Sequence, residues 1–122
     1  MIGYTTVGTD NLERSAKFYD LIFASLGSSR AMQADDFIAW ANAENTPMFS
    51  IHTPVNGQEA TVGNGVMIAL LAENKAQVNA IYSQAITLGA SDEGKPGPRG
   101  DSGFYAAYFR DLDGNKLNIH CM

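Results

Sequence analysis

The sequence is poor in cysteine and in basic residues. Its only cysteine, Cys121, excludes an internal disulfide and a cluster of thiolate metal ligands. Eight Lys and Arg residues stand against thirteen Asp and Glu residues, and the formal net charge is −5. Binding to a nucleic-acid backbone depends on clustered Lys and Arg, so we expect no nucleic-acid partner. A neutral or cationic small ligand suits this acidic chain better.

Long apolar runs and a targeting segment are lacking as well. No run approaches the ~20 apolar residues that a membrane span requires. The start, MIGYTTVG, has no basic stretch followed by an apolar one. We therefore expect no membrane partner and a cytoplasmic location. The 122 residues, of which 45% are hydrophobic and 17% are charged, fit a single globular domain.

What the chain does contain is one pattern that occurs twice. In its first half, residues 1–8 have the composition of a strand, and residues 10–27 have the apolar spacing of a helix. Asp10, with Glu13 three residues later, is the expected N-cap, and Gly27 is the expected stop. Three short strands are expected to follow, at residues 28–33, 37–42 and 47–53.

The second half repeats this plan. Residues 65–72 predict a strand, and residues 74–90 predict a helix with Asn74 as its N-cap. Two last strands are expected at residues 104–110 and 115–121. They are joined by a tight turn in which we expect Asp111, Asp113 and Gly114 to be structural.

A connection rich in Gly and Pro, at residues 91–103, separates this helix from the last two strands and predicts a loop. It could be a mobile lid that carries Lys95 and Arg99 to a ligand anion, or an inert link between strands. Its composition favours the inert link.

Each half thus predicts a strand, a helix and about three strands, an α+β plan with the helix on one sheet face. The first module is expected at about residues 1–58 and the second at about 63–122 of one domain. With NLERSAKFYD early and YFRDLDGNKLNI late, the repeated plan resembles the glyoxalase/bleomycin resistance/dioxygenase superfamily, or vicinal oxygen chelate proteins. The resemblance covers nearly the whole chain. It implies two βαβββ modules forming curled sheets around a shared cleft, usually in a homodimer.

The same resemblance implies three metal-ligand positions, which fall on Tyr4, Met67 and Asn118. A neutral phenol, a thioether and an amide are poor ligands for divalent zinc, nickel or iron. We therefore expect no metal and no other cofactor. The usual metal-dependent glyoxalase or dioxygenase chemistry is not expected either. In the first the metal polarises the substrate's oxygens, and in the second a 2-His-1-carboxylate iron activates oxygen.

Strand alternation predicts which side chains share the ligand face. Val66, Ile68 and Leu70 should pack under a helix, as should Leu117, Ile119 and Cys121, and Cys121 should be inert. Aromatic residues, among them Tyr105 and Tyr108, are candidates for a pocket wall, with methionines as adaptable filler. The expected ligand-binding residues are Tyr4, Thr6, Trp40, Ser50, His52, Met67, Phe104, Asn118 and His120.

These residues predict a metal-independent small-molecule-binding protein that sequesters an aromatic or cationic drug-like ligand. Sequestration needs affinity but no turnover, so it tolerates the loss of metal ligands. The alternative is a lyase, isomerase or dioxygenase with a relocated site, in which His52 and His120 are the candidate catalytic residues. Both histidines could also sit at strand ends and form only local hydrogen bonds.

Overall fold

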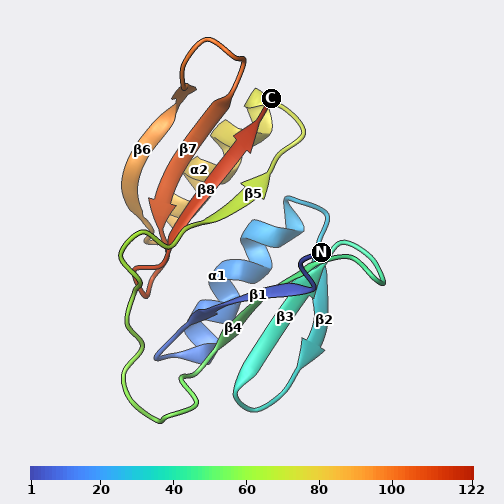
Figure 1. Ribbon diagram of the computed structural model, residues 1–122, viewed down its shortest axis with the longest axis vertical. Helices are drawn as coiled ribbons and strands as arrows, with labels where there is room; N and C mark the ends of the chain where they lie inside the picture. Colours follow the sequence, from blue (N-terminus) through green and yellow to red (C-terminus); the bar gives the residue numbers. More distant parts are fainter. The chain divides into compact units, whose positions relative to one another are not determined.

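The structure is a computed structural model that describes residues 1–122. The chain divides into two compact units, residues 1–62 and residues 63–122 (Figure 1). Each unit has a four-stranded sheet and one helix, and each is described on its own below.

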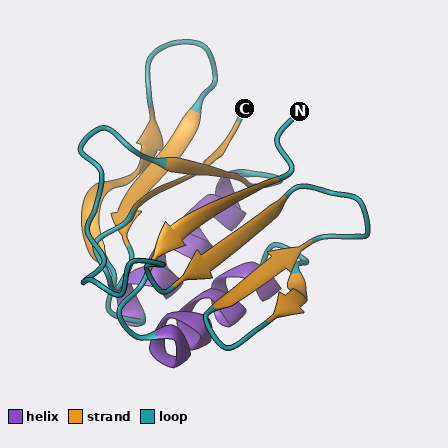
Figure 2. Cartoon of the chain, turned by 60° about the horizontal axis from the view of Figure 1, so that its bottom comes forward, coloured by secondary structure: helices purple, strands orange, loops and turns teal.

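The first unit is one βαβββ module. Its sheet has the order β1-β4-β3-β2, in which β1 is parallel to β4 and the other pairs are antiparallel. The helix α1 covers one face of this sheet (Figure 2). The elements are β1 (Tyr4–Gly8), α1 (Leu12–Ala24), β2 (Ser29–Gln33), β3 (Phe37–Ala41) and β4 (Met48–His52).

The second unit has the same topology, with the sheet order β5-β8-β7-β6 and the helix α2 packed on β6, β7 and β8. Its parallel pair, β5 and β8, corresponds to β1 and β4 of the first unit. The α+β class and the two βαβββ modules expected from the sequence are thereby confirmed. The elements are β5 (Ile68–Leu71), α2 (Lys75–Thr87), β6 (Ser91–Pro98), β7 (Tyr105–Arg110) and β8 (Lys116–Cys121).

The largest correction concerns the connection at residues 91–103. Its first eight residues form β6, which pairs with β7 at the edge of the second sheet. The pairing shifts register twice, between Asp92 and Gly94 and again between Gly94 and Gly97. Bulged edge strands tolerate glycine and proline, which central strands do not. The composition that predicts a loop therefore belongs to an irregular edge strand.

Two strands are shorter than their sequences suggest. The first begins at Tyr4, and β5 begins at Ile68. Val66 and Met67 therefore precede β5, where both are exposed, so Val66 does not pack under a helix as expected. Leu70 is buried as predicted.

Of the two predicted N-cap residues, one is confirmed and one is wrong. Asn74 caps α2, and its side-chain oxygen accepts from the backbone N–H of Gln77 at 2.9 Å. The cap of α1 is Asn11 rather than Asp10. Asp10 instead accepts a hydrogen bond from the backbone N–H of Ala60, at 2.6 Å. Both residue types can cap a helix, so the sequence leaves the position open by one residue.

Both helices end in the same way, as the repeated ASLG and ITLG sequences suggest. Gly27 and Gly89 adopt positive φ angles of 73° and 104°. In each case the next residue donates a backbone hydrogen bond five positions back into the helix, from Ser28 to Phe23 and from Ala90 to Ala85. This is the pattern of a Schellman C-cap, for which glycine is the least strained residue.

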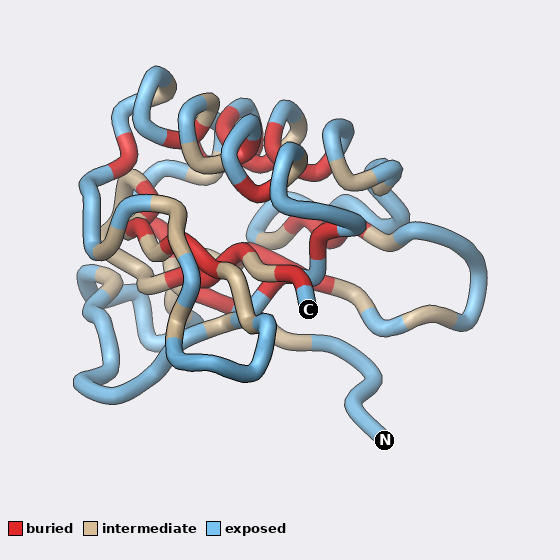
Figure 3. Tube along the Cα trace, turned by 90° about the horizontal axis from the view of Figure 1, so that it is seen from above, coloured by how far each residue is buried: buried red, intermediate tan, exposed pale blue.

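The first core lies between α1 and its sheet. The Tyr19 ring packs at a tilt against Phe49 and Trp40, with ring centroids 4.8 and 5.9 Å away. Trp40 is only 2% exposed, and its indole N–H donates to Asp20 at 2.9 Å. The residue expected to wall a ligand pocket thus packs under the helix instead. Figure 3 shows buried and exposed stretches alternating along the helices.

Asp20 links this core to the edge strand β2. The Arg30 guanidinium donates to both carboxylate oxygens, at 2.9 and 2.7 Å. These hydrogen bonds, together with that from Trp40, hold the pKa of Asp20 below its usual value. The folded protein therefore binds the Asp20 proton less readily than the unfolded chain does.

This shift predicts an acid-dependent contribution of Asp20 to stability. It is present above the usual carboxyl pKa and is lost as the pH falls through the lower pKa of the folded state. The free energy of unfolding of Asp20→Asn should fall short of wild type at pH 6 and approach it at pH 3. Urea unfolding at the two pH values measures this, and a difference that does not change with pH would contradict it.

The second core is built from α2 and the inner faces of β7 and β8. Val78 and Ile81 are fully buried against Phe109, Leu117 and Ile119. Cys121 is also buried, as expected. No helix of the structure has the length and apolar character needed to cross a membrane.

The β7–β8 turn is held by Asp111, which is 5% exposed. Its carboxylate accepts from the backbone N–H groups of Asp113 and Asn115, each at 2.9 Å. Gly114 takes a positive φ of 89°. These contacts give Asp111, Asp113 and Gly114 the structural role in the turn that the sequence predicts.

Candidate functional site

Strand alternation in β4 divides its side chains between two faces. Phe49 and Ile51 are buried, and Phe49 packs against the aromatic rings of α1. Met48, Ser50 and His52 therefore lie on the sheet face opposite α1. The same alternation in β1 and β3 brings further side chains to this face.

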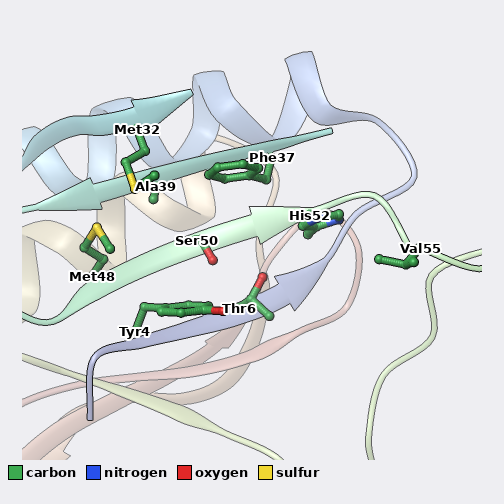
Figure 4. Close-up of a pocket in the computed structure, with 9 residues that line it drawn as sticks. All are labelled: Tyr4, Thr6, Met32, Phe37, Ala39, Met48, Ser50, His52 and Val55. Carbon is green, nitrogen blue, oxygen red and sulfur yellow. The ribbon is translucent and has the colours of Figure 1, made fainter. Parts of the chain in front are cut away.

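These side chains line a cavity of about 440 Å³ within the first unit (Figure 4). Its volume is in the range of small-molecule pockets. Ala39 and Ser50 are its most buried members, at 2% and 5% exposed, and form the floor. The lining residues are Tyr4, Thr6, Met32, Phe37, Ala39, Met48, Ser50, His52 and Val55.

The walls of this cavity are aromatic and thioether groups. Tyr4 on β1 and Met48 on β4 are cross-strand neighbours, and Met32 lies across from Tyr4 on β2 (Figure 4). Phe37 stacks on the His52 ring with a centroid distance of 5.9 Å and an angle of 10° between the rings. Aromatic faces and polarisable sulfur suit a flat, apolar ligand, and methionine adapts to its shape.

The oxygen atoms of Ser50 in the cavity and of Asp36 beside His52 are hydrogen-bond acceptors. The Ser50 hydroxyl donates to the carbonyl of Thr5 at 3.0 Å, which leaves its lone pairs for a ligand. His52 Nδ1 contacts the carbonyl of Thr53, and His52 Nε2 lies 3.6 Å from a carboxylate oxygen of Asp36, so both ring nitrogens face oxygen acceptors. A ligand with N–H donors complements this arrangement.

A second hollow of about 300 Å³ adjoins the cavity at the end of β1. It shares Thr6, His52 and Val55 with the cavity. His52 therefore stands at the junction of both spaces. Its remaining lining residues are Val7, Gly8, Thr53 and Pro54.

The structure brings together four of the expected site residues in the first unit: Tyr4, Thr6, Ser50 and His52. Trp40 is not among the lining residues, because β3 turns it toward α1. Met67 belongs to the second unit and lies just before β5 rather than on it.

The other three expected site residues gather in the second unit. Phe104 lies against the His120 ring with a centroid distance of 5.1 Å. His120 Nδ1 donates to the side-chain oxygen of Asn118 at 2.6 Å. Asn118 is 1% exposed, and its side-chain nitrogen has no hydrogen-bond partner.

Sequence reasoning did not assign Met32, Phe37, Ala39 or Val55 to the site. Two of them could be predicted from the strand sequence FIAWA at residues 37–41. In it, Ile38 and Trp40 alternate with smaller or less buried residues and pack under α1. Alternation then turns Phe37 and Ala39 to the opposite face. Met32 carries no such signal, since all of β2 is exposed and its pairing with β3 is irregular.

The residues at the three metal-ligand positions do not fit a divalent metal. Tyr4 supplies a phenol, Met67 a thioether and Asn118 an amide whose oxygen already accepts from His120. Nowhere do three His, Cys, Asp or Glu side chains gather in a position to hold a metal ion. The two histidines lie in different units.

Two βαβββ modules of identical topology define a paired-module α+β protein. The chain belongs to the Glyoxalase/Bleomycin resistance protein/Dioxygenase superfamily, whose family model matches residues 1–119. The resemblance inferred from the sequence is thereby confirmed. The shared cleft and the homodimer stay predictions.

Solved structures support this assignment. A glyoxalase/bleomycin resistance protein from Albidiferax ferrireducens T118 is 34% identical, with a TM-score of 0.90, over 100% of this chain and 98% of that chain. A lactoylglutathione lyase from Agrobacterium tumefaciens is 20% identical, with a TM-score of 0.71, over 99% and 92% of the chains. A glyoxalase-related enzyme from Fulvimarina pelagi is 19% identical, with a TM-score of 0.77, over 100% and 88%. The last two show the fold alone. A comparison with curated proteins found no match.

Proposed function

We propose that the protein binds a small molecule without a metal ion and sequesters an aromatic or cationic drug-like ligand, as a homodimer in the cytoplasm. The observation that carries the proposal is the cavity of about 440 Å³ on the open face of the first sheet. Its walls are aromatic and thioether groups, and its floor offers the Ser50 hydroxyl oxygen.

The charge of the ligand follows from the polar groups around the cavity. The Ser50 hydroxyl presents an acceptor, and the Asp36 carboxylate lies beside His52. Desolvated acceptors favour a ligand that brings N–H donors, and a nearby carboxylate favours a positive one. The net charge of −5 acts in the same direction at longer range.

Metal independence is supported by donor chemistry at the three ligand positions. Tyr4, Met67 and Asn118 are neutral groups, and none of them is a preferred ligand of a divalent ion. Equilibrium dialysis of the purified protein followed by elemental analysis tests this part. Stoichiometric, tightly held Ni, Zn, Fe or Mn would contradict it.

The ligand class is tested with one ring system in two charge states. Proflavine, a flat aromatic cation, should bind and raise the melting temperature, because a ligand of the native state stabilises it. Acridine-9-carboxylate, an anion on the same ring, should bind the first unit weakly or not at all. His52→Leu should weaken proflavine binding by about tenfold, because it removes an aromatic ring from the cavity wall.

The matched control is His120→Leu, which removes the other histidine from the second unit. Its proflavine affinity should equal that of wild type. If His52→Leu leaves proflavine binding unchanged, or if acridine-9-carboxylate is preferred, the assignment of a cation-binding cavity is wrong. An activity lost in His52→Ala together with a bound metal would favour the lyase, isomerase or dioxygenase alternative instead.

A further inference from the structure

The open face of the second sheet carries two cations that no carboxylate neutralises. The guanidinium of Arg99 and the ammonium of Lys116 lie 5.4 and 5.6 Å from the centroid of the Tyr108 ring. Arg99 also donates to two backbone carbonyls, of Lys95 and Pro98, which leave its charge uncompensated. In a chain with thirteen acidic and eight basic residues, two unpaired cations on one ring form a local positive patch.

The charged residues next to this patch already form an ion pair with each other. Arg110, the cross-strand partner of Lys116, forms an ion pair with Glu93 on β6. That carboxylate is therefore engaged by a guanidinium and does not serve Lys116. The patch keeps two cations that can meet an incoming anion.

A buried amide sits beside this patch. Asn118 is the direct cross-strand partner of Tyr108, and alternation in β8 places it on the same face as Lys116 and His120. Its oxygen accepts from His120 Nδ1, whereas its side-chain nitrogen is buried without an acceptor. Buried amide N–H groups without partners are rare in folded proteins, because losing water without a replacement is costly.

Three groups on this face can only donate hydrogen bonds: Asn118 Nδ2, Arg99 and Lys116. Arg99 and Lys116 both lie against the Tyr108 ring. The Phe104 ring lies tilted against His120 and adds an apolar side. Donors of this kind recognise carboxylate or phosphate oxygens through charge-assisted hydrogen bonds.

We propose that the β7–β8 face of the second unit binds the carboxylate or phosphate group of a small organic anion. Asn118 Nδ2 supplies the central hydrogen bond, Arg99 and Lys116 supply the charge, and Phe104 contacts the apolar part of the ligand. The site uses none of the residues that line the cavity of the first unit, and it favours the opposite charge.

The test uses benzoate and phenyl phosphate, with inorganic phosphate and chloride as comparisons. Either organic anion should shift the side-chain NH₂ signals of Asn118 in a ¹⁵N-correlated NMR spectrum, which Asn118→Asp identifies by deleting them. The tighter of the two anions tells whether carboxylate or phosphate is preferred. Binding should weaken as salt is added, because the two cations are partly exposed.

Two variants measure the contributions of charge and amide. Lys116→Met should lower the affinity for the organic anion by about tenfold or more, which is the effect of one charge-assisted hydrogen bond. Asn118→Asp should abolish binding, because it replaces the Nδ2 donor with a negatively charged oxygen that repels the ligand anion. The matched control, Lys17→Met on the exposed face of α1, removes the same charge elsewhere and should leave affinity unchanged.

Three results would overturn the site. One is an Asn118 NH₂ signal that does not move at saturating anion. Another is an equal loss of affinity in Lys116→Met and Lys17→Met. The third is an adventitious ion only, in which chloride and inorganic phosphate perturb the face as strongly as the organic anions do.

Discussion

Trp40→Ala should lower the free energy of unfolding by about 3–5 kcal/mol, the usual cost of removing a large buried aromatic side chain. Trp40 is 2% exposed and lies within 6 Å of two aromatic rings of α1, those of Tyr19 and Phe23. Its removal also leaves one hydrogen bond of Asp20 unmade. For a chain of this length the melting temperature should fall by about 10–20 °C. Urea unfolding followed by far-UV circular dichroism measures the loss, since Trp40 is the only tryptophan.

The matched control is Tyr4→Ala, which removes a ring that is 64% exposed on the other sheet face. Its effect on stability should stay below about 1 kcal/mol, as for most surface substitutions, whereas proflavine binding should weaken. Trp40→Phe keeps a ring but loses the bond to Asp20, so its cost should be intermediate. If Trp40→Ala were mild and instead abolished ligand binding, Trp40 would be a wall of the site as its sequence suggests.

The contrast between these two aromatics shows what the sequence can predict. Alternation places Tyr4 and Trp40 on defined faces of their strands, but it does not say which face carries the helix. Both residues are plausible ligand contacts by composition alone. Trp40 lies in the core because it packs with the rings of an aromatic cluster. These rings, of Tyr19, Phe23 and Phe49, meet only after the module has folded.

The repeated plan could be predicted because it depends on local signals. Helical spacing, a side-chain cap at Asn74 and glycine stops at Gly27 and Gly89 act within a few residues of each other. The strand β6 could not be predicted in this way. Its Gly-rich and Pro-rich residues, 91–98, become a strand only because β7 offers a partner along its edge. Tertiary pairing there outweighs local preference.

The candidate sites, too, could be predicted only in part. Ser50 and His52 follow from alternation in β4, as do Asn118 and His120 in β8. The polarity of each face does not follow from alternation. It depends on which donors and acceptors are already satisfied, such as the Ser50 hydroxyl by Thr5. The first unit presents the Ser50 oxygen near the Asp36 carboxylate, and the second unit presents the Asn118 amide nitrogen near two cations. The two faces therefore favour ligand groups of opposite charge.

Ala39→Phe should abolish proflavine binding to the first unit. Ala39 lies on the floor of the cavity, on the central strand β3, with its side chain turned away from α1. A phenyl ring there would occupy the space between the aromatic and thioether walls that the ligand needs. Pockets bury most of a ligand's surface, so a filled floor should weaken binding by more than tenfold, or about 1.4 kcal/mol. Fluorescence titration with proflavine measures the loss.

Stability separates blocking of the cavity from damage to the fold. The added ring enters existing space rather than a packed core, so Ala39→Phe should cost less than the ~1–3 kcal/mol typical of overpacking. Leu21→Phe, at a position 48% exposed on α1, adds bulk outside the cavity and should bind proflavine as wild type does. Unchanged binding in Ala39→Phe would place the ligand elsewhere, because no ligand that fills this cavity could tolerate a ring on its floor.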